Sequence, residues 1–159
     1  MVTRAEKPSW SLPCEHAARL LKAIAQFRTG SFSGIGVVFY EDLAQLPHLQ
    51  LTNDEQEPDA AGLAGGDLAS RLAGISVTSS PLHDGFHFVD ARSWQLTHVA
   101  QFISPPIPRD QGQYVHGTGA RLMAAVLASL LPGISCVGLV SHKGEVHLFK
   151  GGVDLANQE

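Results

Sequence analysis

The chain has 159 residues, of which 44% are hydrophobic and 16% charged, and its formal net charge at pH 7 is -4. This composition is typical of a folded globular protein and excludes an intrinsically disordered chain. The length suits one domain with a substantial core. The negative net charge argues against a broad basic surface, so nucleic acid is not an expected partner, although a local basic pocket is compatible with it.

Neither a membrane location nor a disulfide scaffold is predicted by the sequence. No apolar run approaches the length that spans a bilayer, and the first ten residues carry charges without an apolar signal core. The two cysteines, Cys14 and Cys136, form no CxxC pair, and Cys136 lies in an apolar run that places it in the core. We therefore expect a protein of the reducing cytoplasm.

Residues 11–28 predict an amphipathic helix that packs on the core. Five apolar residues recur there at helical spacing: Ala17, Leu20, Leu21, Ile24 and Phe27. Ser11 could cap the start, Pro13 fits the first turn, and Gly30 fits a C-terminal stop.

The next part of the chain predicts a strand, a long loop and a short helix. GIGVVFY at 34–40 is a β-branched and aromatic run typical of a buried strand. Residues 41–66 are polar or small and show no core pattern, which favours a surface loop or insertion. A short helix is expected at 67–72.

Residues 85–103 predict a pair of strands. GFHFVD at 85–90 and QLTHVAQFI at 95–103 are joined by a tight turn at ARSW, 91–94. Proline cannot donate to a sheet ladder, so the pairing should end before the prolines that follow, which are Pro105, Pro106 and Pro108.

The first of these strands has two different faces. Side chains alternate along a strand, so Phe86 and Phe88 share one face, and Asp84 joins them if the strand begins that early. His87 and Val89 then point to the other face.

The C-terminal third predicts a helix and a hairpin. Thr118 opens the helix, Pro132-Gly133 ends it, and its apolar stripe consists of Leu122, Met123, Val126, Leu127, Leu130 and Leu131. ISCVGLVSH and EVHLFK then flank Lys143-Gly144, which is a strong hairpin signal. Together these elements predict a single α/β domain with a mixed β-sheet flanked by helices.

GTGAR at 117–121 is a candidate anion site. A glycine-rich loop that enters a helix presents free backbone N–H groups at the positive end of the helix dipole. Thr118 could cap the helix and donate to a phosphate, and Arg121 could add a bidentate contact. The alternative is a capped helix whose glycines, Gly117 and Gly119, serve only the turn.

The histidines suggest a metal site. His83 and His87 are four residues apart, and together with His98 or His116 they could hold zinc or manganese. The alternative is a scatter of surface and loop histidines, because no HExxH-like signature is present.

Asp84 could be a turn residue, because Asp-Gly is a frequent turn pair. The order of segments around it, however, resembles the bacterial diadenylate cyclase domain. PLHDG at 81–85 agrees with the family's Pro-Leu-His-Asp-Gly-Ala segment, with Phe86 where the family has Ala. HVAQFISPP at 98–106 resembles its second strand and the exit from it.

The resemblance continues to the C-terminal hairpin. GTGAR keeps Gly117, Thr118 and Arg121 of the family's Gly-Thr-Arg-His-Arg helix start, and GLVSHKGEVHLFKGG at 138–152 resembles the terminal hairpin. The matching segments cover about residues 68–152 and occur in the family's order.

The resemblance implies roles for particular residues. Asp84 would help bind a metal, Mn²⁺ or Mg²⁺, and prepare the ribose hydroxyl for attack. Eight residues would line the nucleotide site: Asp84, Gly85, Phe86, Gly117, Thr118, Gly119, Arg121 and Ser141. Two departures stand out. Gly119 and Ala120 replace a cationic Arg-His pair, and His142 stands where the family has a metal-binding glutamate.

Three functions follow as alternatives. The first is a degenerate relative that binds ATP, another adenine nucleotide or a cyclic dinucleotide as a sensor or regulatory module. The second is an active cyclase that condenses two ATP into cyclic di-AMP in a face-to-face homodimer, with Asp84 catalytic and His142 a second metal ligand. The third is a protein-interaction domain without a ligand, in which 41–66 would be the docking element.

Overall fold

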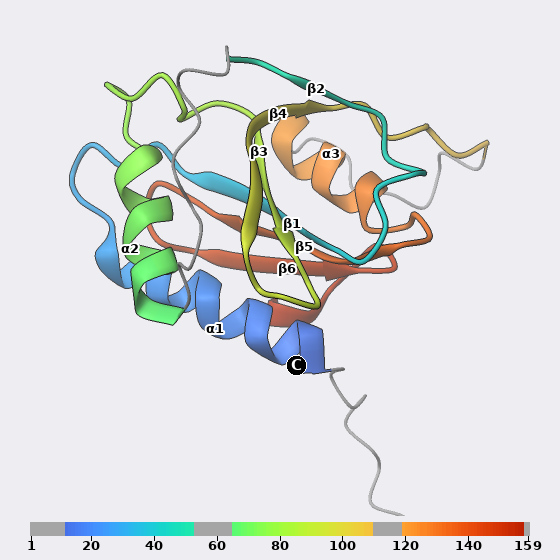
Figure 1. The fold of residues 1–159 in the computed structure, drawn as a ribbon, viewed down its shortest axis with the longest axis horizontal. Coiled ribbons are helices and arrows are strands. Elements are labelled where there is room, and N and C mark those ends of the chain that lie inside the picture. The colour runs from blue at the N-terminus through green and yellow to red at the C-terminus, as the bar shows by residue number, and fades with distance from the viewer. Residues whose placement is uncertain (1–11, 53–64, 110–118, 158–159) are drawn as a thin grey trace, which may run out of the picture.

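The computed structural model describes residues 12–52, 65–109 and 119–157. Its elements in chain order are α1 (Leu12–Phe27), β1 (Ile35–Tyr40), β2 (His48–Gln50), α2 (Gly65–Ile75), β3 (Phe86–Asp90), β4 (Leu96–Ile103), α3 (Ala120–Ala128), β5 (Ile134–Val140), β6 (Val146–Lys150), β7 (Val153–Asp154) and a final 3-10 turn, Leu155–Asn157. The strands form one seven-stranded sheet in the order β2-β4-β3-β1-β5-β6-β7 (Figure 1). Only β1 and β3 are parallel neighbours, and the other pairs are antiparallel.

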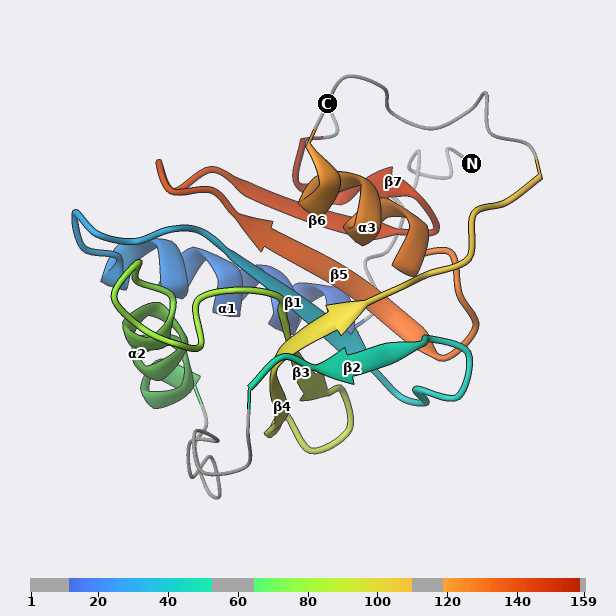
Figure 2. The ribbon, with the colours of Figure 1, turned by 90° about the horizontal axis from the view of Figure 1, so that it is seen from above.

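The sheet separates two hydrophobic cores. Helices α1 and α2 pack on one face and α3 lies on the other, as the view from above makes plain (Figure 2). On the α1/α2 face the strands contribute Ile35, Val37, Phe39, Val89, Cys136 and Leu148, and on the α3 face they contribute Val38, Phe86, Phe88, Val137 and Phe149. The predicted mixed α/β domain is therefore confirmed.

Helix α1 follows its prediction closely. The stripe predicted to be buried is buried from Ala17 to Ile24, but Phe27, its last member, is 49% exposed. Phe27 is the last residue of the helix, and Arg28 there donates its Nη1 to the carbonyl of Ala25. Cys136 is in the core, as expected, and a hydrogen bond with buried Cys14 together with burial raises the pKa of the Cys136 thiol.

The prediction of a loop over 41–66 is wrong for its first part. Residues 48–50 form β2, whose three residues pair with β4 from His48↔Ile103 to Gln50↔Gln101. The strand is short and its middle residue, Leu49, is exposed, so no buried alternation marks it. Helix α2 is longer than the predicted 67–72, and residues 53–64 lie outside the described residues.

Helix α3 is shorter than predicted. It begins at Ala120 with Gly119 as its N-cap and ends at Ala128, so Leu130 and Leu131 lie beyond the helix. Its fully buried residues are Ala125, Val126, Leu127 and Ala128. Two small alanines on that face let the helix approach the sheet closely, which the predicted stripe of large residues did not include.

The predicted strand pair is present, with an irregular register. β3 begins at Phe86, so Asp84 precedes the strand instead of sharing its face. Phe86 pairs with Gln101 and Phe88 with His98, which leaves one extra residue in β4 and makes a bulge near Ala100. The C-terminal hairpin of β5 and β6 agrees with its prediction.

None of the helices in the described ranges combines the length with the apolarity that crossing a bilayer requires.

Candidate functional site

Most of the predicted site residues that the structure describes gather at one edge of the sheet. β1 and β3 are parallel and both begin there, while antiparallel β5 ends there, with Gly36 paired to Phe86 and Ile35 to Val140. Phe86 therefore lies next to β1, and Ser141 directly follows the neighbouring strand. Gly117 and Thr118 lie outside the described residues.

Arg121 reaches this edge from the first turn of α3. Its Nη1 is 3.1 Å from the point that a Cβ on Gly34 would occupy, and the carbonyl oxygen of Val140 is 3.1 Å from the same point. Gly34 has φ +91, so a side chain there would be strained as well as crowded. The absence of a side chain at Gly34 leaves room for the guanidinium beside the backbone.

The guanidinium of Arg121 is partly buried and has spare donors. It makes no hydrogen bond or ion pair with any residue of the described ranges. A guanidinium carries five N–H donors in a planar fork that matches a phosphate or carboxylate. The position suits an anion.

Gly85 fixes the start of β3. Its φ is +78, and a Cβ on it would lie 2.6 Å from the carbonyl oxygen of Gln101. The next residue, Phe86, is buried, and its ring fills the space beside Gly36, where a Cβ would come within 2.5 Å of it. Glycine is thus required at both positions by close packing, and Phe86 is core at the margin of the site.

Asp84 is placed on the surface in the turn before β3. Its side chain is 72% exposed, and its Oδ2 lies 3.9 Å from Nε2 of His83. The Nδ1 of His83 lies 2.7 Å from the carbonyl oxygen of Ser80, to which it can donate. The carboxylate of Asp84 is therefore open to a ligand from solvent, and the turn holds its neighbour in place.

His87 is fully buried and acts as a hydrogen-bond acceptor. The backbone N–H of Ala100, a residue with φ 50, donates to Nδ1 of His87 at 3.1 Å. Burial, reinforced by the positive charge of Arg121, lowers the pKa of His87 from 6.5 to about 3. The neutral ring stabilises the bulge in β4.

The histidines do not converge. His87 is buried with its Nδ1 occupied, His83 is in the turn before β3, and His98 contacts the rings of Phe88 and His48. His116 lies outside the described residues. Across the part of the chain that the structure describes, no three His, Cys, Asp or Glu side chains group to hold a metal ion. The donor set near Asp84 therefore does not fit a metal held by these side chains alone.

Ser141 and His142 lie in the hairpin turn after β5. The Ser141 hydroxyl oxygen accepts the backbone N–H groups of Lys143 (3.2 Å) and Glu145 (3.1 Å), which organises the turn. Its own proton remains available for donation. His142 is exposed, and its backbone nitrogen is 3.6 Å from the point that a Cβ on Gly34 would occupy.

Gly119 has open space around it. No heavy atom lies within 4 Å of the position of its missing Cβ, and the residue is exposed at the N-cap of α3. Its backbone φ of -52 is available to every amino acid. A larger side chain could therefore be accommodated at this position, unlike at Gly34 or Gly85.

Sequence reasoning missed Arg28 as a cation near this edge. Its guanidinium carbon is 2.6 Å from the point that a Cβ on Gly144 would occupy, so it lies against the turn that carries Ser141. A basic residue at the end of a helix is ordinarily assigned to the helix dipole. Only the meeting of the hairpin with the end of α1 reveals its place.

The fold and this edge define one mixed α/β domain, and two solved structures share its fold. A protein from Bacillus cereus described as a hypothetical membrane spanning protein matches with a TM-score of 0.61 and 18% identity, over 93% of this chain and 64% of that one. DacA from Staphylococcus aureus, crystallised as a double mutant, matches with a TM-score of 0.51 and 19% identity, over 89% of this chain and 83% of that one.

The chain thus spans less than two thirds of the length of the Bacillus cereus protein. The sequence matches no family model and no curated protein sequence. At these identities the likeness shows the fold alone, and that fold agrees with the resemblance to diadenylate cyclase domains drawn from the sequence motifs.

Proposed function

We propose that this domain binds the phosphate groups of an adenine nucleotide or a cyclic dinucleotide at the Arg121 edge, as a degenerate relative of the diadenylate cyclases with a sensor or regulatory role. The observation that carries the proposal is the guanidinium of Arg121, which is partly buried beside Gly34 without a partner among the described residues. Leaving donors of a charged group unmet in a partly buried place costs free energy, which a bound anion would recover.

Three further features support a phosphate ligand at this edge. Gly34 and Gly85 expose backbone close to the start of two parallel strands. Asp84 and Ser141 offer an exposed carboxylate and a hydroxyl with a free proton. Ribose hydroxyls and phosphate oxygens are suitable partners for these two groups.

The proposal requires binding more than catalysis. Phosphoryl transfer depends on metal ions and cations that neutralise charge on the phosphates. The described residues around Asp84 do not assemble a metal site, and Gly119 and Ala120 offer no charge where the family has two cationic residues. Binding survives such losses more easily, because one charged contact removed from a transition state is worth about two decades in rate.

The test is a titration of the purified protein with ATP and with cyclic di-AMP, in Mg²⁺, in Mn²⁺ and without metal. We expect saturable binding of at least one ligand, weakened about tenfold by Arg121→Gln because a charged contact is lost. Arg92→Gln is the matched control, since Arg92 is exposed in the turn at the opposite end of β3. Thermal unfolding of each variant checks that the fold is retained.

Mass spectrometry of the same mixtures separates the alternatives. Cyclic di-AMP that forms from ATP and disappears in Asp84→Asn would establish the active cyclase instead of the sensor. No binding of either ligand at about 1 mM would overturn the proposal and favour the protein-interaction domain. Equal affinity in wild type and Arg121→Gln would remove Arg121 from the site.

A further inference from the structure

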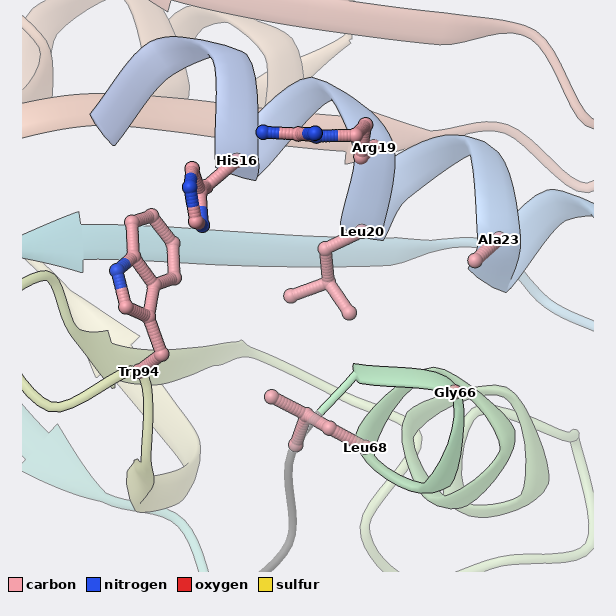
Figure 3. Close-up of a pocket in the computed structure, with 7 residues that line it drawn as sticks. All are labelled: His16, Arg19, Leu20, Ala23, Gly66, Leu68 and Trp94. Carbon is pink, nitrogen blue, oxygen red and sulfur yellow. The ribbon is translucent and has the colours of Figure 1, made fainter. Parts of the chain in front are cut away.

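A second cavity lies on the other face of the sheet. It has a volume of about 330 Å³ and is lined by His16, Arg19, Leu20 and Ala23 of α1, by Leu68 of α2 and by Trp94 of the turn between β3 and β4. Figure 3 shows Leu20 and Leu68 pointing into the space between the helices, with the indole of Trp94 closing one end. Helix α3 and Arg121 belong to the opposite face.

The Trp94 end of the cavity is rigidly built. The rings of His16 and Trp94 stack with centroids 4.9 Å apart and planes at 27°, and Phe39 lies behind Trp94 at 5.9 Å. The backbone of Trp94 has φ 57, which is unusual for a bulky residue. Hydrogen bonds around Asp90 hold this conformation, because Trp94 N donates to Asp90 O at 2.7 Å and Asp90 N donates to Gln95 O at 3.0 Å.

A strained backbone that presents an aromatic ring to a cavity points to recognition. Strain of this kind stays only where the surrounding structure maintains it, and it is enriched at ligand sites. The ring is partly exposed instead of being buried in the core. A flat ligand could therefore lie between the indole and the leucine side chains and gain stacking contacts of the kind aromatic pairs make.

The rim supplies one type of charge. Arg19 extends along α1 toward His16 above the cavity (Figure 3) and makes no hydrogen bond or ion pair with the described residues. The groups around it are an imidazole, an indole and aliphatic side chains, and no carboxylate lines the cavity among the described residues. A single guanidinium over an apolar space matches a ligand with an apolar body and one carboxylate.

We propose that this cavity is a binding site for a small aromatic carboxylate, whose ring lies against Trp94, Leu20 and Leu68 and whose carboxylate pairs with Arg19. The volume is near the lower end for ligand sites and suits a compound of one or two rings. The site is independent of the Arg121 edge, so it holds whether or not the domain binds nucleotides.

The test uses 2-naphthoate and its neutral analogue 2-naphthamide as probes, titrated against the purified full chain by ligand-observed NMR. We expect saturable binding of 2-naphthoate with a dissociation constant below about 1 mM, and binding of the amide at least about fivefold weaker. Arg19→Gln should bring the two probes to equal affinity. Arg71→Gln, on exposed α2 surface outside the lining, should change neither probe.

Two further variants keep the outcome decisive. Ala23→Phe fills the cavity from α1 and should reduce binding of both probes at least about tenfold, with the fold checked by circular dichroism. Arg121→Ala should leave both affinities unchanged, which separates this site from the nucleotide site. Failure of the naphthoate to bind, equal affinity for acid and amide in the wild type, or unchanged binding in Arg19→Gln would each overturn the proposal.

Discussion

The two faces of the sheet present different chemistry to a ligand. On the α3 face, Arg121 lies across the start of β1, beside backbone left open by Gly34 and Gly85. On the α1/α2 face, the accessible cavity is bounded by rings and aliphatic side chains, with Arg19 at its rim. One region offers backbone and charge, which suit phosphate. The other offers flat apolar surface, which suits a ring.

The contrast follows from how each region is built. Glycine at a strand start lets another group come close to the main chain, so the Arg121 edge depends on absent side chains. The cavity depends on large side chains held apart, with Trp94 fixed by its turn. Substitutions should therefore damage the two regions in opposite ways. Adding atoms harms the first, and it fills the second without disturbing the sheet.

The largest effect is expected from Gly85→Ala. The new methyl group would meet the Gln101 carbonyl oxygen at 2.6 Å, and φ +78 is unfavourable for alanine. Backbone cannot move aside as a flexible side chain can, so we expect the free energy of unfolding to fall by about 3 kcal/mol. Chemical denaturation measures it.

Gly74→Ala is the matched control for Gly85→Ala. Gly74 lies in α2 with no atom within 4 Å of a new Cβ, so alanine there should stabilise the protein by about 0.5–1 kcal/mol. Equal effects of the two substitutions would show that the close approach at Gly85 is not a constraint.

The next effect concerns acid stability and His87. Its pKa is lowered to about 3 in the folded protein, against 6.5 in the unfolded chain, so the unfolded state takes up a proton first as the pH falls. His87 then has no effect on stability well above pH 6.5 and reduces it by about 1.4 kcal/mol per pH unit below that, or roughly 2.5 kcal/mol by pH 4.5.

Denaturation curves from pH 8 to pH 4.5 check this prediction. His87→Gln should be less stable at neutral pH and should lose the histidine part of the acid slope. His142→Gln is the control, because His142 is exposed and its removal should leave the slope unchanged. An acid slope that persists in His87→Gln would contradict the role assigned to the buried ring.

Much of the fold could be predicted from periodicity, because long elements with a buried face carry a strong pattern. Helix α1 and strands β1, β3, β4, β5 and β6 were recognised in this way. β2 was not, since its three residues belong to the sheet only through pairing with β4. The early end of α3 was missed because Leu130 and Leu131 continue the apolar spacing after the helix has ended.

The candidate site was predictable only in part. The segments around Gly85, Arg121 and Ser141 were singled out, and the sheet brings the strand segments to one edge. The turn role of Ser141 and the burial of His87 depend on contacts between distant segments, which no local pattern contains. The cavity at Trp94 was missed for the same reason, since His16 and Trp94 are far apart in the sequence.

A smaller effect should distinguish charge from shape at Arg121. Arg121→Gln removes the charge, and we expect about tenfold weaker nucleotide binding. Arg121→Lys keeps the charge and loses the planar fork, so about threefold weaker binding is expected if the contact is bidentate. Calorimetric titration of both variants measures the difference. Identical affinities for lysine and wild type would mean that Arg121 acts as a point charge.

The smallest effect should come from adding a charge at Gly119. The position is exposed with open space around it, and an arginine occupies it in the diadenylate cyclase motif that the sequence resembles. Gly119→Arg should strengthen nucleotide binding about threefold, because an exposed cation contributes under 1 kcal/mol. Gly74→Arg adds the same charge on α2, also in open space, and should leave the affinity unchanged.

The salt dependence of this gain sharpens the comparison between the two faces. A cation near the phosphates acts through a screened field, so the advantage of Gly119→Arg should shrink as ionic strength rises from low values to about 0.15 M. Binding of 2-naphthoate near Trp94 should not respond to Gly119→Arg at all, since the sheet lies between the two regions. An equal gain for both ligands would indicate a general charge effect. A gain confined to the nucleotide would locate the phosphates beside the start of α3.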